Sequence, residues 1–430
     1  MEELYDAIIV SIDYDDGYIN YYEKELANLC EANNLNHVYK VRQKLDKPKV
    51  GYYVGVGKLD EIKMIAATYN IELVIFNDEL SPSQLRNIEN YLDLEVIDRS
   101  MLILNIFADR AKTNESMIEV ALAQYKYMLP RLTGLSKSLS RQGGGFNAKG
   151  PGETQLELDR RKIEKRIYKL ESDLKKINIS RQNRINKRSD KTVALVGYTN
   201  SGKSKLMNAL IELYQDNKKK VFSKDMLFAT LTTSNRKITF PDNQSFILTD
   251  TVGFVSKLPH HLINSFKSTL QEINEADLIL HVIDCANPNF KLQIDVTNKV
   301  LEELGCKDIP ILYVYNKCDL LDEQFFPEED NAIMISAKTG FNLKLLATTI
   351  KTTILNEVTT LELFIPYDRG DLVNKIRENE NLIKIEYKDT CINLLATIKN
   401  KNLHIYEEYK KALWLALFYS KLIKLMSTPL

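Results

Sequence analysis

The chain has 430 residues, enough for two to four domains with separate cores, and its 58 basic side chains balance 58 acidic ones. Zero net charge excludes a global attraction to nucleic acid or membrane, so any such contact must come from a local patch. The five cysteines are scattered without a C-x-x-C pair, which argues against disulfides and a structural zinc ion. The first residues are acidic and no apolar run approaches about 18 residues, so we expect a cytoplasmic protein that does not insert into a membrane.

Strand and helix patterns alternate along the first 111 residues. Strand-like or helical segments follow one another at residues 7–12, 21–30, 73–76, 81–92 and 94–97. Such alternation is typical of a mostly parallel sheet covered by helices. We therefore predict an N-terminal α/β domain over residues 1–111.

The next segment, residues 112–188, has a different pattern. Apolar side chains recur every three or four positions from Ile118 to Leu129 and again from Ile163 to Ile177, which is the seam of two long amphipathic helices. The glycine-rich residues 136–152 lie between them. Two such helices joined by a loop predict an antiparallel helical hairpin.

Positive charge is concentrated in this part of the chain. Residues 125–190 contain 17 Lys or Arg and 7 Asp or Glu. A run of charge is ordinarily a solvated helix face, but a basic, glycine-rich loop at the tip of a hairpin favours contact with RNA phosphates. The side chains that we expect to contact RNA are Arg141, Lys149, Arg160, Arg161 and Lys165.

The α/β pattern resumes at residue 189 and continues to residue 358. Strand-like runs occupy residues 192–196, 246–248, 278–283, 309–315 and 332–335. They predict a central domain with a doubly wound sheet. Residues 359–430 then predict a small C-terminal α+β domain, with strands at 361–365, 382–387 and 391–398 and a helix from Glu407. The fold class is thus α/β multidomain.

A phosphate-binding loop follows the first strand of the central domain. Residues 197–204 read G-Y-T-N-S-G-K-S, the G-x-x-x-x-G-K-S pattern between a buried strand and a helix. Backbone N–H groups and the helix N-terminus can bind phosphates there. The residues in this predicted site are Gly197, Tyr198, Thr199, Asn200, Ser201, Gly202, Lys203 and Ser204. Lys203 should pair with the β- and γ-phosphates, and the Ser204 hydroxyl should ligate Mg²⁺.

A second element of the nucleotide site is D-T-V-G at residues 250–253. Asp250 follows an apolar strand and can reach the shell of the Mg²⁺ ion, and the Gly253 N–H is placed to contact the γ-phosphate. One phosphate loop alone would also suit a kinase or an ATPase. The two further motifs that follow in order indicate a GTPase.

Those two motifs would select guanine. Asn316, Lys317 and Asp319 form N-K-x-D, in which a carboxylate accepts both the N1 and N2 protons of guanine. Adenine would leave the Asp319 carboxylate without a partner, which gives strong discrimination. In the second motif, Ser336, Ala337 and Lys338, the Ala337 N–H should donate to guanine O6 and Lys338 should support the loop.

The switch region should lie between residues 216 and 236. It contains Thr230, Thr232 and Thr233, and we choose Thr230 as the Mg²⁺ ligand. After Gly253 comes Phe254, where Ras-like GTPases have the Gln that orients the attacking water. Phenylalanine cannot do this, so we expect slow intrinsic hydrolysis and a partner that completes the site.

Several further motifs lie outside the nucleotide site. They are V-G-V-G-K at 54–58, V-I-D-R at 96–99, I-F-A-D-R-A at 106–111, L-P-R-L at 129–132, G-G-G at 143–145 and G-P-G-E-T at 150–154. With D-T-V-G-F at 250–254, they resemble the HflX family of ribosome-associated GTPases over residues 50–360.

The resemblance implies a GTPase that binds GTP and GDP, associates with the large ribosomal subunit and its RNA, and separates stalled or idle ribosomes, particularly under stress. It also implies that the ribosome stimulates hydrolysis. The chain departs from the family at Lys205, where Thr is usual, and at residues 231–236, which leaves the choice of switch threonine open. We expect a monomer.

Two other classes of function remain open from the residues alone. One is a GTP-dependent switch with a protein or membrane partner, in which the basic hairpin is only a solvated coil. The other is an RNA-remodelling ATPase, against which Asp319 argues.

Overall fold

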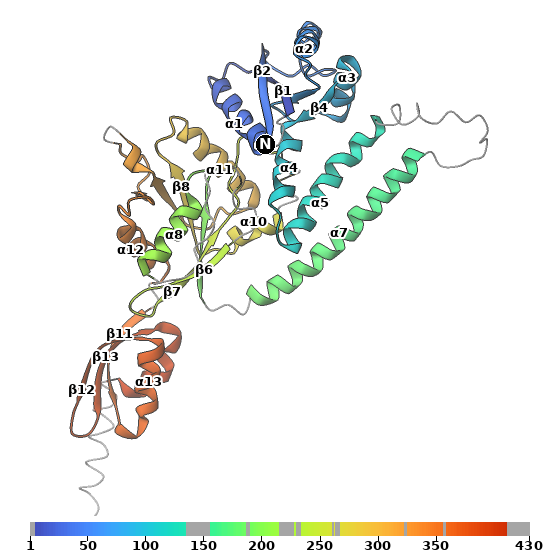
Figure 1. Ribbon diagram of the computed structural model, residues 1–430. Helices are drawn as coiled ribbons and strands as arrows, with labels where there is room; N and C mark the ends of the chain where they lie inside the picture. The colour runs from blue at the N-terminus through green and yellow to red at the C-terminus, as the bar shows by residue number, and fades with distance from the viewer. Residues whose placement is uncertain are drawn as a thin grey trace, which may run out of the picture.

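The structure is a computed structural model that describes residues 5–134, 155–185, 190–214, 228, 234–259, 262, 267–321, 325–355 and 358–410. Within these residues the strands form a parallel N-terminal sheet, a mixed central sheet and an antiparallel C-terminal sheet, with a helical region between the first two (Figure 1). The predicted α/β multidomain fold is confirmed.

The described strands of the N-terminal sheet run parallel in the order β2-β1-β3-β4. Their bounds are β1 Tyr5–Asp13, β2 Leu35–Lys44, β3 Leu73–Phe76 and β4 Glu95–Asp98. Alternate side chains of a strand point to opposite faces. Accordingly Ala7 and Ile9 enter one apolar cluster, while Ile8 and Val10 enter another on the opposite face.

Helices cover both faces of this sheet. They are α1 Ile19–Ala32, α2 Val56–Tyr69, α3 Pro82–Leu92 and α4 Arg99–Arg110. Helix α3 begins as predicted, with a capping box in which the Ser81 hydroxyl accepts from the Gln84 N–H at 3.2 Å. Leu26 of α1 and Leu104 of α4 pack on one face, and Leu59 of α2 and Ile88 of α3 pack on the other.

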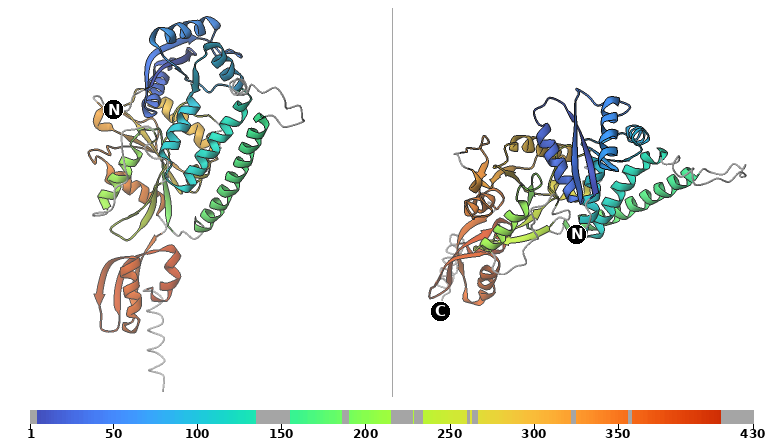
Figure 2. Two further views of the ribbon diagram at one scale, coloured as in Figure 1. Left: turned by 45° about the vertical axis from the view of Figure 1, so that its right-hand side comes forward. Right: turned by 45° about the horizontal axis from the view of Figure 1, so that its top comes forward.

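The helical middle region consists of α5 Asn114–Met128, the 3₁₀ segment η1 Leu129–Gly134 and α7 Gln155–Ile185. Helices α5 and α7 lie side by side and antiparallel in both figures, and Lys126 pairs with Glu171 at 2.7 Å (Figures 1 and 2). The predicted glycine-rich loop, residues 136–152, lies outside the described residues.

The described central sheet has the order β10-β9-β8-β5-β7-β6 and is parallel except for the edge strand β6. Its strands are β5 Lys191–Val196, β6 Ser234–Thr239, β7 Ser245–Asp250, β8 Leu278–Asp284, β9 Ile311–Asn316 and β10 Ala332–Met334. Its helices are α8 Lys203–Tyr214, α10 Lys267–Asn274, α11 Phe290–Leu304 and α12 Leu343–Ile354. Helices α8 and α12 pack on one face and α10 and α11 on the other, as in a doubly wound fold.

One apolar cluster joins the N-terminal domain to the central domain. It contains Leu104 of α4 and Val120 of α5 together with Val196 of β5 and Ile273 of α10. The two domains therefore share a core. In the two further views of Figure 2, the N-terminal sheet and its helices lie against the central domain.

The C-terminal domain has a core of its own, centred on residues such as Leu394. Its described strands are ordered β11-β13-β12, with β11 Val358–Ile365, β12 Asn381–Tyr387 and β13 Ile392–Lys399, and α13 Gly370–Asn379 packs against them. The predicted helix from Glu407 begins as the 3₁₀ segment η6 Glu407–Tyr409, and residues 411–430 lie outside the described part. Among the described helices, none combines the length and apolar character needed to cross a bilayer.

The shared core leads to a prediction on stability. Leu104→Ala removes a fully buried side chain from that core and should lower the free energy of unfolding by about 2–5 kcal/mol. The loss should accelerate hydrogen exchange in both the N-terminal and central domains, measured by mass spectrometry in mild denaturant. Leu394→Ala, the matched control in the C-terminal core, should affect that domain alone. Faster exchange confined to residues 5–134 in the first variant would contradict a shared core.

Candidate nucleotide-binding site

The predicted nucleotide motifs meet at one edge of the central sheet. Strands β9, β8, β5 and β7 are neighbours and parallel, so their carboxyl ends lie together. Residues 197–204 follow β5, Asp250 ends β7 and Asn316 ends β9. The carboxyl edge of such a sheet is where ligands bind.

Two glycines are required by the backbone of the phosphate loop. Gly197 has φ +147° and Gly202 has φ +95°, conformations that L side chains rarely adopt. A Cβ at Gly197 would also collide with the Val282 carbonyl oxygen, and one at Gly202 would collide with the Asn316 amide. The glycines of the motif thus permit both the turn and its close contact with neighbouring strands.

Lys203 lies folded back on the phosphate loop. Its Nζ donates to the Gly197 carbonyl at 3.0 Å and to the Tyr198 carbonyl at 2.7 Å. Burial lowers the pKa of Lys203 to about 8, and the nearby Asp250 carboxylate offsets part of that shift. These two bonds use two of the three N–H donors of the ammonium group, which leaves one for a phosphate oxygen.

Ser204 and Asp250 face each other. The Ser204 hydroxyl donates to Asp250 Oδ2 at 2.6 Å. A hydroxyl and a carboxylate are the hard oxygen ligands that Mg²⁺ prefers, and at phosphate sites Mg²⁺ takes only one or two protein ligands beside water and phosphate. This pair fits such an ion, although no cluster of three His, Cys, Asp or Glu suited to a metal occurs among the described residues.

Asn316 ties the base loops to the phosphate loop. Its amide Nδ2 donates to the Ser201 carbonyl at 2.9 Å, and its Oδ1 accepts from the Ala337 N–H at 3.0 Å. The Ala337 N–H, which we expected to donate to guanine O6, is therefore engaged by Asn316 in this structure. Lys317 Nζ pairs with Asp284 at 2.7 Å, beside these loops.

Asp319 is exposed at the same edge. Ser336 Oγ donates to its Oδ1 at 2.6 Å, and this bond lowers the pKa of the carboxyl, with Lys338 contributing in the same direction. The group therefore stays ionised and accessible, as an acceptor of the two guanine protons must be.

Phe254 is almost fully buried in the core that the two domains share. Its backbone forms a bridge to the phosphate loop, since the Phe254 N–H donates to Gly197 O at 3.1 Å and Thr199 N–H donates to Phe254 O at 2.8 Å. The predicted switch residues Thr230, Thr232 and Thr233 lie outside the described residues.

Of the five predicted RNA-binding residues, three lie in the part of the chain that the structure describes and two lie outside it. Arg160, Arg161 and Lys165 are exposed on α7, away from the nucleotide motifs, whereas Arg141 and Lys149 lie outside the described residues. Arg160 forms an ion pair with Glu164 at 3.0 Å along the helix surface. Three of the five expected contacts are thus on one solvent-facing helix.

Two buried charges beside the site were not predicted. Glu25 of α1 accepts from the Tyr198 hydroxyl and pairs with Arg99, the first residue of α4. No pattern in the sequence around Glu25 could predict these contacts, because its partners are distant in sequence. Arg99 lies within a family motif quoted above, but the pattern alone did not indicate a contact with the phosphate loop.

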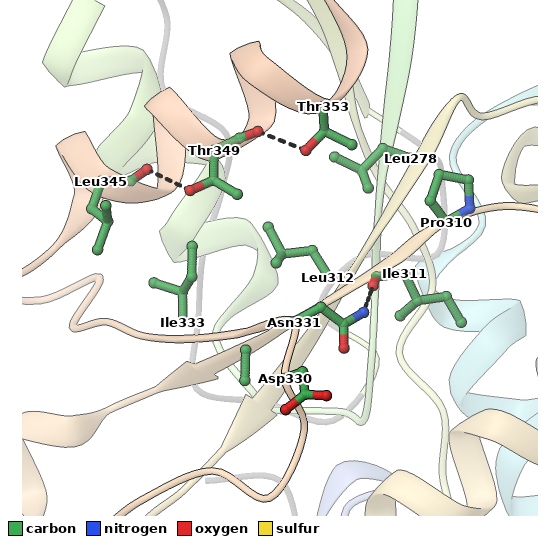
Figure 3. Close-up of a pocket in the computed structure, with 11 residues that line it drawn as sticks. Leu278, Pro310, Ile311, Leu312, Asp330, Asn331, Ile333, Leu345, Thr349 and Thr353 are labelled. Carbon is green, nitrogen blue, oxygen red and sulfur yellow. Dashed lines mark hydrogen bonds between the residues drawn. The ribbon is translucent and has the colours of Figure 1, made fainter.

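A hollow lies at the opposite edge of the central sheet from the nucleotide motifs. It has a volume of about 360 Å³ and is lined by the first residues of three strands, including Leu278 and Ala332, and by Thr349 and Thr353 of α12 (Figure 3). Because it is at the amino ends of the strands, it is separate from the nucleotide motifs.

The fold and the edge motifs together define a P-loop GTPase. Residues 192–317 match the family described as 50S ribosome-binding GTPase, residues 20–108 match GTP-binding GTPase N-terminal, and residues 110–188 match GTP-binding GTPase Middle Region. Relatives named GTPase HflX cover most of the chain. The one from Caldanaerobacter subterraneus subsp. tengcongensis is 42% identical over 87% of this chain and 86% of its own, and the one from Escherichia coli is 38% identical over 84% and 85%.

The chain therefore belongs to the HflX family of ribosome-binding GTPases, and it is a GTP hydrolase. A crystal structure of a GTP-binding protein from Sulfolobus solfataricus with GDP is also similar, with 26% identity, 81% of this chain and 98% of that chain covered, and a TM-score of 0.41.

The buried ammonium group predicts proton uptake on nucleotide binding. With the pKa of Lys203 at about 8 in the free protein, most of the group is neutral above that pH and must be recharged when phosphate binds. Proton uptake per bound GDP should rise from near zero at about pH 7 to about one at about pH 9, and affinity should fall over that interval. Calorimetric titration in buffers of different ionisation enthalpy measures the uptake. Lys205→Met, the exposed neighbour, should leave it unchanged, and uptake independent of pH would contradict the assignment.

Proposed function

We propose that this GTPase acts on the large ribosomal subunit and splits stalled or idle ribosomes under stress, with Mg²⁺ as its cofactor. The observation that carries the proposal is a guanine-nucleotide site joined through one core to a helical region with an exposed basic helix. The match to a family described as 50S ribosome-binding supports the partner. Location in the cytoplasm and a monomeric state stay predictions from the sequence.

Each polar group at the phosphate end of the site would have its own role. Lys203 would donate to the β- and γ-phosphates, and the Gly253 N–H would donate to the γ-phosphate. The Ser204 hydroxyl and the Asp250 carboxylate, whose oxygens are 2.6 Å apart, would hold Mg²⁺. When bound, the ion would supply positive charge that offsets the charge of the phosphates.

Guanine selection would rest on Asp319. Its carboxylate is exposed and held ionised by Ser336, and Asn316 fixes the loop beside it. Lys317 would pack its stem along the base. An adenine base offers an acceptor at N1 and no 2-amino group, so it would leave the Asp319 carboxylate unpaired.

Nucleotide choice can be tested with Asp319→Asn. The amide presents a donor where guanine also presents one, so GTP affinity should fall about tenfold or more, while affinity for xanthosine triphosphate should rise. Fluorescence titration of both nucleotides and ATP measures the change. Lys344→Met, an exposed lysine of α12 outside the guanine motifs, is the control, and equal affinity of the wild type for GTP and ATP would contradict guanine selection.

Hydrolysis would depend on the ribosome because Phe254 has no group that can orient water. Loss of an oriented water and of transition-state charge stabilisation can reduce the rate by several orders of magnitude. A partner would supply what is missing. The basic helix α7 would bring that partner to the molecule through ribosomal RNA.

The expected result is slow phosphate release alone and at least about a hundredfold faster release with large subunits. Fast turnover that ribosomes do not change would contradict the role of the partner. Splitting itself is measured by sucrose-gradient sedimentation of whole ribosomes with GTP, GDP and a non-hydrolysable analogue. Failure of the GTP-bound protein to bind or split them would favour a switch with a different partner.

The contribution of α7 can be tested by charge reversal at Arg160, Arg161 and Lys165. Binding to large subunits should weaken, and its dependence on salt should decrease by about one unit of logarithmic slope for each lost phosphate contact. GTP affinity should not change. The matched control reverses the exposed Lys299, Lys307 and Lys344 of the central domain. Equal binding by both triple variants would make α7 a structural spacer.

A further inference from the structure

The hollow at the amino ends of the central strands has an apolar floor (Figure 3). Its lining includes large apolar side chains from β8, β9, β10 and α12, namely Leu278, Leu312, Ile333 and Leu345. Leu345 is 52% exposed, so this apolar surface is open to solvent. The volume of about 360 Å³ is at the small end of the range for ligand sites, about 300–1,000 Å³. The hollow therefore suits a small ligand or a side chain inserted by a partner.

The polar atoms around this floor are mainly hydrogen-bond acceptors. The Thr349 hydroxyl donates to the Leu345 carbonyl at 3.1 Å, and the Thr353 hydroxyl donates to the Thr349 carbonyl at 2.8 Å (Figure 3). Their protons are thus already used, and their oxygens keep lone pairs that can accept. The Asn331 amide donates to the Ile311 carbonyl, and its side-chain oxygen is an acceptor as well. A ligand of the hollow must therefore supply the hydrogen-bond donors.

Asp330 adds a negative charge at one end of the hollow. In Figure 3 it lies beside Asn331, below the apolar side chains. The Asp330 carboxylate is exposed and forms no ion pair or hydrogen bond within the part of the chain that the structure describes, whereas Glu328 pairs with Lys291 at 2.7 Å. Among the described residues, those that line the hollow include no Lys, Arg or His. The charge of Asp330 is therefore available to a cation from outside the chain.

An arginine side chain matches these features together. Its methylene stem can be buried along apolar surface while its charged end stays at the polar rim. The guanidinium group has only donors and no acceptor, and its planar fork can bond a carboxylate in a bidentate manner. Lysine offers a compact point charge without this fork. A phosphate offers acceptors and negative charge, which the Asp330 carboxylate would repel.

The distribution of charge favours a basic protein segment over RNA at this face. The positive excess of the chain lies in residues 125–190, and the hollow lies outside that range. Residues 328–330 are three consecutive acidic residues, and the exposed Asp308 is two positions before Pro310, which lines the hollow. Complementary charge attracts a partner and rejects partners of the same sign. RNA phosphates are thus disfavoured here, and basic segments of proteins are favoured.

We propose that the hollow binds an arginine side chain presented by a basic segment of a partner protein. The guanidinium group is bound by Asp330, and the stem lies against Leu312 and Ile333. This surface is at the opposite sheet edge from the nucleotide motifs and separate from the basic helix α7, so one molecule can bind nucleotide, RNA and the protein segment at once. The inference does not depend on the proposed ribosomal function.

The test is a titration of the full chain, with labelled methyl groups, by a basic peptide followed by NMR. The probe is acetyl-Gly-Lys-Gly-Arg-Gly-Lys-Gly-amide, which should shift the methyl signals of Leu312, Ile333 and Leu345. Replacing its arginine by citrulline, which is neutral and of the same shape, should lower the affinity about tenfold because the charge-assisted bonds are lost. Asp330→Asn should lower it by a similar factor. Asp308→Asn, the matched control, removes a nearby exposed charge outside the hollow and should leave the affinity within about twofold of the wild type.

A second variant tests the apolar part of the site. Thr349→Phe fills the hollow and keeps Asp330, so the peptide should no longer shift the remaining methyl signals. Unchanged GTP affinity shows that each variant is folded. Equal affinity of the wild type and Asp330→Asn for the peptide, or no shift in the wild type, would overturn the proposal and leave the GTPase assignment intact. Shifts of the same methyl signals by an oligouridylate, or tighter binding of free arginine amide than of the peptide, would also overturn it.

Discussion

The buried ion pair of Glu25 and Arg99 lies where the N-terminal domain, the phosphate loop and the Ser256 segment meet. Desolvation of two charges offsets much of their attraction, so such a pair adds little net stability, whereas loss of one partner leaves an uncompensated buried charge. The ion pair instead affects how the two domains are oriented relative to each other. Arg99 also donates to Asn77 at 2.9 Å, and together these bonds specify one orientation of the two domains.

The surrounding apolar core makes that orientation rigid. Strand β5 alternates, with Val193 and Leu195 in the cluster under α8 and α12 and Ala194 and Val196 in the cluster shared with the N-terminal helices. The strand that ends in the phosphate loop is thus buried on both faces, as expected for a central parallel strand. Phe254 belongs to the shared cluster, so its position depends on both domains.

Sequence patterns within a few neighbouring residues were enough to predict some of the strands, helices and motifs. The continuous apolar run at Leu73–Phe76 matches β3, and the nucleotide motifs meet because consecutive loops lie at one sheet edge. Strand β2 was missed because it is an edge strand with largely polar, exposed positions, and α4 because Asp98 ends β4 and caps the helix at once. The contacts of Glu25 were unpredictable, since they join positions 173 and 231 residues apart.

The positive charge of the chain is concentrated in one part of this architecture. The chain is neutral as a whole, yet residues 125–190 carry an excess of ten positive charges, so the remainder is negative by the same amount. At physiological ionic strength the field of exposed charges is screened within about 8 Å. Helix α7 lies along α5 at the edge of the molecule (Figures 1 and 2). Its basic side chains from Arg160 to Lys176 are exposed. An RNA surface at α7 would therefore meet mainly the positive charge of this helix, because charges farther away than this distance are largely screened.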